Sequence, residues 1–383
     1  MKFQVTKSVL DSVCTKFGRL LSSTVTIPIL EGVLVEVKES HIDFIVSNGD
    51  ESMLERVNLS EDVCVEVIGR AVFPRTLFSM TRKLKTGVID FSLSISSSQI
   101  TVKQKKTQLD FQAMSAEDFP NIMTNQKPIN TFQLPYSVFK SFIEDTVYAV
   151  ATSDTRPILQ GVKLEFTPSS NGDCIFSSVA TDSHRLAQCK TKNYETNENT
   201  VVMVPAGASL VQAVKSFNGN TEIGVFCYKN QIAFVSGNKK TIMYCRLLEG
   251  TYPATSKLIP QTTSFFTLQT TELVGVVELI KTIKKDTVCK LEYKSGSITI
   301  SSNVPGGISK VQQELTVFDC QTEDKFTFSC SAEYLLESLK TISTEKVMLK
   351  VVEPLRPFLV SNVYEDVNNY DEQIQLILPI RSY

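Results

Sequence analysis

Apolar residues recur along the chain with two different periods, and the order of these periods predicts the order of secondary-structure elements. Six segments place apolar residues three and four positions apart, as one face of an amphipathic helix requires. The segments between them alternate apolar and polar residues, which is typical of half-buried strands. In each third of the chain the pattern predicts a strand, a helix, several strands, a second helix and further strands, so we expect an α+β fold.

In the six predicted helices the basic residues lie off the apolar face. The predicted buried faces are Leu10, Val13, Cys14, Phe17 and Leu21; Leu77, Met80 and Leu84; Phe139, Phe142, Ile143 and Val150; Leu210, Ala213, Val214 and Phe217; Leu273, Val276, Val277 and Ile280; and Leu335, Leu339 and Ile342. The basic residues off these faces are Lys16, Arg19, Arg75, Arg82, Lys83, Lys140, Lys215, Lys281, Lys285 and Lys340. Solvated lysines are common on helices, but several acidic residues of this chain fall in strands and loops. We therefore interpret the basic helix faces as a local cationic surface for phosphate.

An internal repeat divides the chain into three. The motif PILEGV at residues 28–33 returns as PILQGV at residues 157–162, and an alternating strand follows each copy. A third copy keeps only the strand, KLEY at residues 290–293. Since the spacing is close to a third of the 383 residues, we predict three similar domains at residues 1–125, 126–254 and 255–383. An aromatic residue before a proline, Phe119-Pro120 and Tyr252-Pro253, favours an extended connector at each of the two boundaries.

The stretch TDSHRLA at residues 181–187 holds one of the two histidines of the chain. Neighbouring residues of an extended chain point to opposite faces, so Asp182, Ser183 and His184 cannot form a catalytic relay among themselves. Because residues 174–180 read as a strand, we predict that the strand runs into a turn which presents His184, Arg185 and Leu186 at a surface rim.

Composition and charge exclude several classes of site. The 39 basic and 41 acidic residues give a net charge of -2, so a nucleic-acid-binding role requires cations gathered on one surface. Nine cysteines without a Cys-x-x-Cys pair, together with two histidines, have no zinc-site spacing, so we expect no metal and no cofactor. Unclustered cysteines, the absence of a signal region and the absence of a long apolar run predict a cytoplasmic protein.

The motifs together resemble the bacterial sliding clamp, the beta subunit of DNA polymerase III. The resemblance rests on TDSHRLA, on the two Pro-Ile-Leu-x-Gly-Val copies, on EDFPN at residues 117–121, on LILPIR at residues 376–381 and on the opening MKF. It covers all three predicted domains. It implies three clamp-type domains, each with two helices packed on antiparallel sheets, that form half of a six-domain ring.

The resemblance also implies what the ring does. Two chains would join head to tail and encircle double-stranded DNA, with the helices around the hole and without reading the base sequence. The protein would be a processivity factor without catalytic activity, and its partners would be the replicative polymerase, a separate ATPase as clamp loader and other proteins with a clamp-binding motif. A loader must be separate because this chain has no phosphate-binding Gly-x-x-x-x-Gly-Lys-Ser/Thr loop.

Partner proteins of similar clamps insert a peptide carrying leucine and an aromatic residue between the second and third domains. The matching positions are Leu159, Thr181, Ser183, His184, Arg185, Leu186, Pro253, Lys257, Leu258, Ser331, Tyr334, Leu355, Pro357, Ile377, Leu378, Pro379, Ile380 and Arg381. Four of them depart from the family: Ser183 replaces the usual glycine, Lys257 an arginine, and Leu378 and Ile380 the methionines of some members. Loss of the adaptable methionine side chain is expected to narrow the range of partners.

Two further expectations follow from the resemblance. Ring closure would join the first domain of one chain to the third domain of the other, with the edge strand at residues 106–111 and with Phe111 and Leu273 as apolar anchors. Thr24 stands where some clamps have an arginine that contacts DNA.

The residues alone leave two other classes of function open. One is an enzyme, against which stand the absence of a Gly-x-Ser-x-Gly motif and of metal-ligand clusters. The other is a three-repeat adaptor that binds proteins but not DNA. Without the resemblance, Leu159, Leu186, Ile377 and Leu378 are also readily interpreted as ordinary core.

Overall fold

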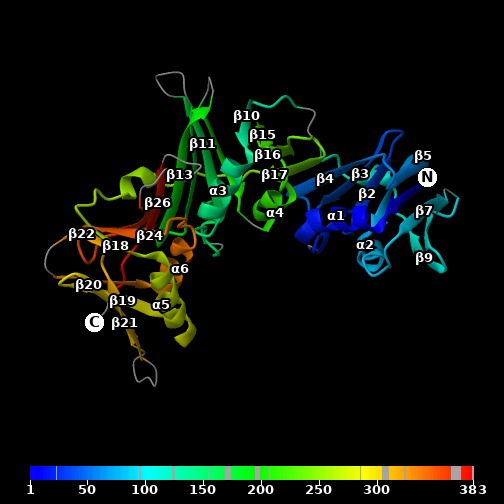
Figure 1. Cartoon of the computed structure of the whole chain (residues 1–383). Helices are drawn as coiled ribbons and strands as arrows, with labels where there is room; N and C mark the ends of the chain where they lie inside the picture. The colour runs from blue at the N-terminus through cyan, green and yellow to red at the C-terminus, as the bar shows by residue number, and fades with distance from the viewer. Residues whose placement is uncertain are drawn as a thin grey trace. The chain divides into compact units, whose positions relative to one another are not determined.

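The predicted order of elements is confirmed in the computed structural model (Figure 1). The structure describes residues 1–22, 24–94, 96–122, 126–153, 155–168, 174–194, 199–206, 208–284, 286–303, 310–322, 325–363 and 372–381. None of the helices described has the length and apolar character that crossing a membrane requires.

Each third of the chain contains two α-helices among strands. The first third has β1 (Lys2–Thr6), α1 (Lys7–Phe17), η1 (Gly18–Ser22), η2 (Pro28–Glu31), β2 (Gly32–Val37), β3 (His41–Ser47), β4 (Glu51–Asn58), β5 (Val63–Val67), β6 (Gly69–Pro74), α2 (Arg75–Thr81), β7 (Val88–Ser94), β8 (Gln99–Gln104), β9 (Thr107–Gln112) and η3 (Ala116–Asp118). The second has β10 (Asn130–Pro135), α3 (Tyr136–Val147), η4 (Pro157–Gln160), β11 (Gly161–Pro168), β12 (Cys174–Thr181), β13 (Arg185–Tyr194), β14 (Thr200–Pro205), α4 (Ala208–Ser216), β15 (Glu222–Cys227), β16 (Gln231–Ser236), β17 (Thr241–Arg246) and η5 (Thr255–Leu258). The third has β18 (Ser264–Gln269), α5 (Thr270–Ile283), β19 (Val288–Lys294), β20 (Ser297–Asn303), β21 (Lys310–Thr316), β22 (Asp319–Gln321), β23 (Lys325–Ser331), α6 (Ala332–Leu339), β24 (Lys346–Val351), β25 (Phe358–Asn362) and β26 (Glu372–Ile377).

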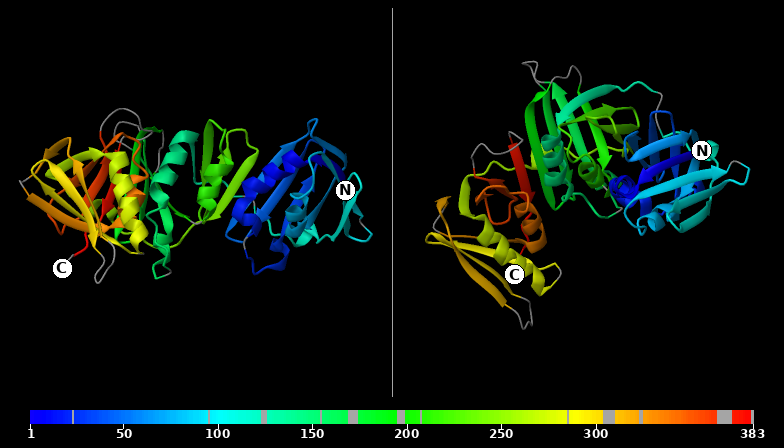
Figure 2. Two further views of the ribbon diagram at one scale, coloured as in Figure 1. Left: turned by 60° about the horizontal axis from the view of Figure 1, so that its bottom comes forward. Right: turned by 45° about the vertical axis from the view of Figure 1, so that its right-hand side comes forward.

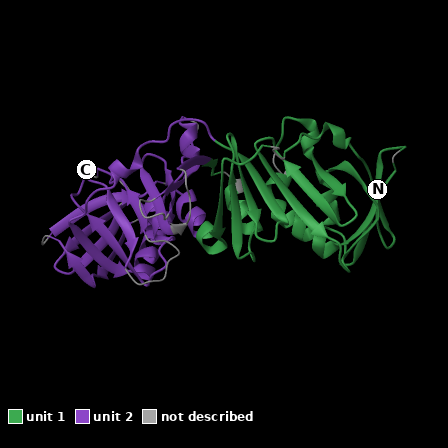
Figure 3. Ribbon diagram, turned by 90° about the horizontal axis from the view of Figure 1, so that it is seen from above, with its two compact units in different colours: residues 1–140, 204–247 green, residues 141–203, 248–383 purple. Residues whose placement is uncertain are grey.

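The chain folds into two compact units, which Figure 3 colours separately. Unit 1 contains Met1–Lys140 and Val204–Leu247, and unit 2 contains Ser141–Met203 and Leu248–Tyr383. Unit 1 combines parts of the first and second thirds of the chain, and unit 2 combines parts of the second and last thirds. The reason is that strands from neighbouring thirds pair in one sheet. In unit 1, β17 pairs with β4, and in unit 2, β13 pairs with β26.

The described strands form antiparallel sheets. Unit 1 has a sheet with the order β5-β1-β7-β8-β9 and a longer one with the order β10-β15-β16-β17-β4-β3-β2-β6. The two sheets of unit 2 have the orders β14-β11-β12-β13-β26-β25-β24-β18-β22 and β21-β20-β19-β23. Figure 2 shows α5, in yellow, and α6, in orange, side by side in unit 2.

The predicted helix faces form the core, with one correction. The apolar residues predicted within α1, α3, α4, α5 and α6 are buried, whereas Leu21, Val150 and Ile342 lie beyond the helix ends and are only partly buried. In α2 the predicted face is wrong at Met80, which is 44% exposed. This helix ends at Thr81 and buries Leu77, Phe78 and Thr81, with Phe78 packed edge-on against the ring of Phe44.

Both copies of the repeated motif have the same local structure. Pro28 and Pro157 each begin a short 3-10 helix, where a proline needs no hydrogen-bond donor, and a strand follows directly. Leu30 and Leu159 at the third position of the two motifs are buried. In both copies the repeated motif therefore forms a 3-10 helix that leads directly into a strand.

Candidate peptide-binding site

The turn between β12 and β13 is built by local hydrogen bonds from the residues that the sequence singled out. The Asp182 carboxylate accepts hydrogen bonds from the backbone N–H groups of His184 at 2.8 Å and Arg185 at 3.0 Å. The Thr181 hydroxyl accepts one from the Ser183 N–H and donates one to the Arg185 carbonyl oxygen. Ser183 has a φ of 78°, in the left-handed region that favours glycine. The predicted strand followed by a turn is thus confirmed.

Two of the three residues predicted at the surface rim lie inside the protein. His184 is exposed, but Arg185 is 8% exposed and Leu186 is 1% exposed. They are the first residues of β13, a strand inside the sheet that pairs with both β12 and β26. Arg185 packs against Tyr148, Tyr334 and Glu337, and Leu186 packs in an apolar cluster on the sheet. The expectation that Arg185 and Leu186 stand at a rim is therefore wrong.

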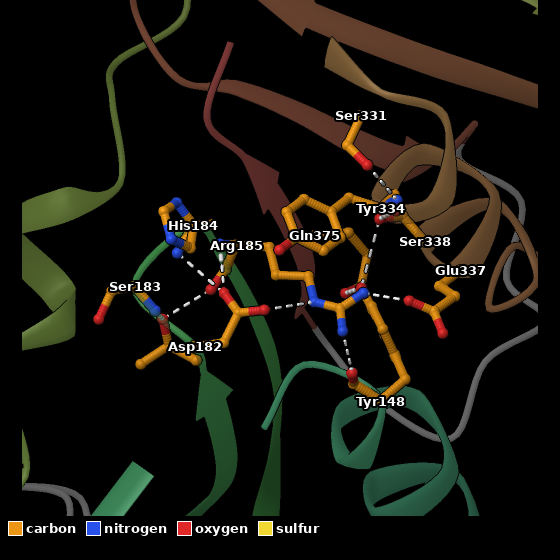
Figure 4. A network of polar contacts seen from close by, with 11 residues as sticks. Tyr148, Asp182, Ser183, His184, Arg185, Ser331, Tyr334, Glu337, Ser338 and Gln375 are labelled. Atoms are coloured by element: carbon orange, nitrogen blue, oxygen red, sulfur yellow. Dashed lines mark hydrogen bonds and ion pairs between the residues drawn. The ribbon is translucent and has the colours of Figure 1, made fainter. Parts of the chain in front are cut away.

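Arg185 lies at the centre of a polar network (Figure 4). Its Nε donates to Asp182 at 3.0 Å, its Nη1 donates to Glu337 on α6, and its Nη2 donates to the Tyr148 carbonyl oxygen at 2.6 Å. The guanidinium carbon lies 4.5 Å from the ring centre of Tyr334 and 5.2 Å from that of Tyr148, within cation–π distance. Burial alone lowers the pKa of Arg185, but the hydrogen bond and charge of Glu337 outweigh burial and raise it.

Tyr148 connects the network to β26, near the C-terminus. Its hydroxyl donates to Gln375 on β26, and Ser338 on α6 lies 3.4 Å from the same oxygen. Burial raises the pKa of Tyr148 well above its ordinary value, so the hydroxyl keeps its proton. Tyr148, Glu337 and Gln375 were not predicted from the sequence. Only the spacing of Glu337, three residues after Tyr334 on the same helix, indicated that it shares a face with a predicted site residue.

A crevice of about 610 Å³ opens beside this network within unit 2. Its walls are Val150, Ala151, Thr152, Ser153, Thr155, Arg156, Leu159, Asp182, Ser183, His184, Arg185, Glu333, Tyr334 and Glu337. The structure thus brings together five of the predicted pocket residues, which are Leu159, Ser183, His184, Arg185 and Tyr334. The rings of His184 and Tyr334 stack with centroids 6.4 Å apart.

The C-terminal segment runs beside the turn. The Leu378 N–H donates to the His184 carbonyl oxygen at 2.9 Å, and the Ile380 N–H donates to the Ser329 carbonyl oxygen at 2.7 Å. Thr181 and Ile377 are buried, and Leu186 packs in a small cluster with Val179, Leu359, Ile374 and Leu376. The core interpretation therefore holds for Leu159, Leu186 and Ile377 but not for Leu378, which is 36% exposed.

The remaining pocket candidates line other parts of unit 2. Exposed among them are Pro253, Lys257, Leu258, Leu355, Leu378, Ile380 and Arg381, whereas Ser331, Pro357 and Pro379 are partly buried. Ser331 caps α6 by accepting a hydrogen bond from the Tyr334 N–H. The exposed leucine and isoleucine side chains give unit 2 apolar surface outside the crevice.

The basic residues predicted on outer helix faces are not equivalent. Those exposed are Arg19, Arg82, Lys83, Lys140, Lys215, Lys281 and Lys340. Lys281 forms an ion pair with Glu333 at 3.0 Å. Lys16 instead pairs with the buried Glu55 at 2.6 Å and with Thr241. Lys285 lies outside the described residues.

Arg75 contradicts the expectation that it points away from the core. Its guanidinium is partly buried and donates to the carbonyl oxygens of Leu30 and Ser47, and burial lowers its pKa. Arg75 begins α2, and its long side chain reaches the carbonyl oxygens of Leu30 in η2 and of Ser47 at the end of β3. Arg75 is therefore not a surface cation.

The residues expected at ring closure, and Thr24 in the loop expected near DNA, differ in their exposure. β9 is an edge strand of its sheet, and Phe111 on it is partly buried. Leu273, expected as an apolar anchor of ring closure, is instead fully buried in the core of unit 2. α5 turns Leu273 toward the core and exposes Leu279 instead. Thr24 is exposed.

The chain is similar in sequence to known proteins along its length. The N-terminal, central and C-terminal domains of the DNA polymerase III beta subunit match residues 1–123, 133–254 and 256–381. The chain is 29% identical to the beta sliding clamp of Bacillus subtilis over the full length of both chains, and 29% identical to that of Streptococcus pneumoniae over 99% of each.

Solved structures agree with these matches along the whole chain. The crystal structure of the Bacillus subtilis sliding clamp superposes with a TM-score of 0.88 at 27% identity, and that of the Streptococcus pyogenes beta subunit with 0.88 at 26%, each covering 100% of both chains. This chain belongs to the DNA polymerase III beta subunit family, the sliding clamps.

Proposed function

We propose that this chain is a processivity factor without catalytic activity, and that two copies close head to tail into a ring around double-stranded DNA. The observation that carries the proposal is the succession of three matching domains along one chain, each with a pair of helices. We place the domain boundaries at residues 1–125, 126–254 and 255–383.

DNA would be held by the exposed cations on or next to the helices. Arg82, Lys83, Lys140, Lys215 and Lys340 are exposed at α2, α3, α4 and α6. Contacts to phosphate alone hold a duplex without reading its sequence, which suits a protein that slides. We exclude Lys16 and Arg75 from these DNA-facing cations because Lys16 pairs with Glu55 and Arg75 donates to backbone carbonyl oxygens.

Ring closure would use strand edges. β9 ends the five-stranded sheet of unit 1, and β21 ends the four-stranded sheet of unit 2. Pairing β9 of one copy with β21 of the next would cover both edges, which otherwise invite aggregation. Head-to-tail contacts of this kind close into a ring when the rotation permits.

The crevice beside Arg185, together with exposed Leu258, Leu355, Leu378 and Ile380, would receive the partner peptide. An apolar anchor side chain buried in a pocket with a polar rim is a common means of peptide recognition. Tethering a polymerase in this way raises its effective concentration at the template, and that increase in local concentration is the whole mechanism.

The ring is tested by mass and topology. Light scattering should give twice 42.7 kDa in dilute solution. After incubation with nicked circular DNA and a clamp loader, the protein should survive a high-salt wash and should be released when the circle is cut. A monomer, or equal retention on linear DNA, would contradict the ring, and peptide binding without DNA retention would favour an adaptor.

The pocket is tested separately by deleting residues 378–383. Because Leu378 and Ile380 are tied to the turn and to β23, the deletion should abolish binding of a labelled peptide carrying leucine and phenylalanine, while the mass in solution stays that of a dimer. Retained peptide binding would refute the assigned pocket.

A further inference from the structure

The carboxylate of Glu337 joins parts of the crevice wall that come from distant segments of the chain. We propose that Glu337 is a positioning residue: by pairing with the buried Arg185 it holds α6 against the turn at residues 181–185 and keeps the crevice in the shape that receives a partner peptide. The inference rests on the proposed function only for the identity of the ligand.

Arg185 binds three separate segments with three different nitrogen atoms. Nε reaches Asp182 in the turn, Nη1 reaches Glu337 on α6, and Nη2 reaches the carbonyl oxygen of Tyr148 just after α3. All three segments contribute to the crevice or border it. In Figure 4 the guanidinium lies between the two carboxylates, with the ring of Tyr334 nearby. A planar guanidinium with fixed donor directions suits this fixing of three segments better than a lysine.

The first third of the chain contains the same turn without the arginine. In the turn at residues 47–51, the Asn48 side chain accepts hydrogen bonds from the N–H groups of residues 50 and 51 at 3.1 and 2.9 Å, as Asp182 does in the second turn. The Ser47 hydroxyl accepts from the N–H of Gly49 at 3.1 Å, as Thr181 does from Ser183. Glu51 occupies the position of Arg185. The turn therefore folds without an arginine, and the Arg185–Glu337 pair has a different role.

That role follows from the cost of burying a charge. Arg185 is 8% exposed, and a buried cation is tolerated only when carboxylates and hydrogen-bond acceptors surround it. Loss of the Glu337 carboxylate removes the charged acceptor of Nη1, so Arg185 must turn this donor toward water or draw water in. Either movement displaces the stacked rings of His184 and Tyr334 that form the wall.

The second acidic residue of α6 provides an internal comparison. Glu333 also borders the crevice, but its partner is Lys281 on α5 at 3.0 Å, so its ion pair lies within the predicted third domain. Neutralising Glu333 changes the charge of the crevice without releasing Arg185. Neutralising Glu337 changes the charge of the crevice and also releases Arg185.

The experiment compares Glu337→Gln with Glu333→Gln and with Glu278→Gln, an exposed residue on α5 outside the crevice. In the full-length protein we measure the dissociation constant of a fluorescein-labelled peptide with two leucines and a phenylalanine. Glu337→Gln should weaken binding about tenfold, within the range of couplings between contacting residues. Glu333→Gln should change it less than about threefold, and Glu278→Gln should match the wild type.

Hydrogen exchange in the absence of peptide separates this inference from the proposed function. Glu337→Gln should speed amide exchange at residues 148–153 and 182–185, and Glu333→Gln should not. Glu337→Asp, which keeps the charge on a shorter side chain, should recover part of the protection, and thermal unfolding identifies a variant that does not fold.

Failure of the wild type to bind the peptide would count against the proposed function while the exchange data still decide the role of Glu337. Equal binding and equal exchange for Glu337→Gln and Glu333→Gln would overturn the inference.

Discussion

Ser183 occupies a backbone conformation that serine rarely adopts. Its φ of 78° is held by hydrogen bonds that the Thr181 and Asp182 side chains accept from the N–H groups of Ser183 and His184. An L-residue in this region is strained by contact between its Cβ and the backbone, whereas glycine is not. The equivalent position in the first third of the chain, Gly49, is a glycine with φ of 103°.

We therefore predict that Ser183→Gly stabilises unit 2 by about 1 kcal/mol, because relief of strain exceeds the added freedom of the unfolded chain. Urea unfolding measures the change. Since the Ser183 side chain is exposed, no packing is lost, and a destabilised variant would contradict the strain argument.

Glu51 shows how burial changes the behaviour of a carboxyl group. Burial, reinforced by the charge of Asp50 and opposed by the Asn48 amide, raises the pKa of Glu51 to about 6. A raised pKa means that the folded state binds the proton more tightly than the unfolded state. The stability contributed by protonated Glu51 is therefore fully present below about pH 4.5 and is lost as the pH rises through about 6.

Glu51→Gln should accordingly stabilise the protein at pH 8 by about 2 kcal/mol, at 1.36 kcal/mol for each unit of pKa shift, and should have little effect at pH 4. The measurement is the difference in unfolding free energy between variant and wild type at each pH. Equal differences at both pH values would show that the carboxyl titrates normally in the folded state.

Among the elements of unit 1, side chains of α4 cap the C-terminal end of α1. The Gln212 amide donates to the carbonyl oxygens of Thr15 and Lys16 at 3.1 and 3.0 Å, and the Ser216 hydroxyl donates to Lys16 at 2.9 Å. These carbonyls belong to the last turn of α1, where partners within the helix are missing. Gly18 ends the helix with a φ of 47°, and a Cβ there would lie 2.4 Å from Gln212 Oε1.

Gly18→Ala should therefore destabilise unit 1 by about 2 kcal/mol, because alanine is strained at this φ and displaces the Gln212 amide from its acceptors. Thermal unfolding measures the loss. Gly275 on α5 is the matched control: a Cβ there meets nothing within 4 Å, so Gly275→Ala should stabilise by about 1 kcal/mol. A neutral Gly18→Ala would mean that Gln212 contributes nothing to this contact.

At the scale of the whole molecule, function depends on where charge lies, because the net charge is only -2. The exposed cations at helices include Arg82 and Lys83, whereas Arg56 is engaged by the buried Asp43 at 2.8 Å and Lys16 by Glu55. A cation that contacts phosphate releases counterions from DNA, and exposure is the condition for that contact.

Reversing Arg82 and Lys83 to glutamate should shorten the lifetime of the protein on circular DNA several-fold and weaken its dependence on salt. The same reversal at Lys229, which is exposed in the turn after β15, should leave that lifetime unchanged. Equal effects of the two reversals would remove α2 from the proposed DNA-facing surface.

The order of elements, the repeat and the family could be predicted from the sequence. Helical and strand periods are local properties, so the faces of α1, α3, α4, α5 and α6 were predictable from neighbours three or four residues away. The turn at residues 181–185 was predictable for the same reason, since its hydrogen bonds join residues within four positions. The motifs that carry the family resemblance are likewise short stretches of chain.

Which of these residues reach the surface depends on contacts between segments that are far apart in the chain. Arg185 became a buried charge because Glu337 approaches it from 152 residues further along the chain. Leu273 is buried in the core, and Arg75 donates to carbonyl oxygens of η2 and β3, which lie 45 and 28 residues earlier in the chain. Pairing of β13 with β26 and of β4 with β17 also groups strands of different repeats into one sheet. Burial and ion pairing depend on neighbours that no local period specifies, and for this reason the site emerged only with the fold.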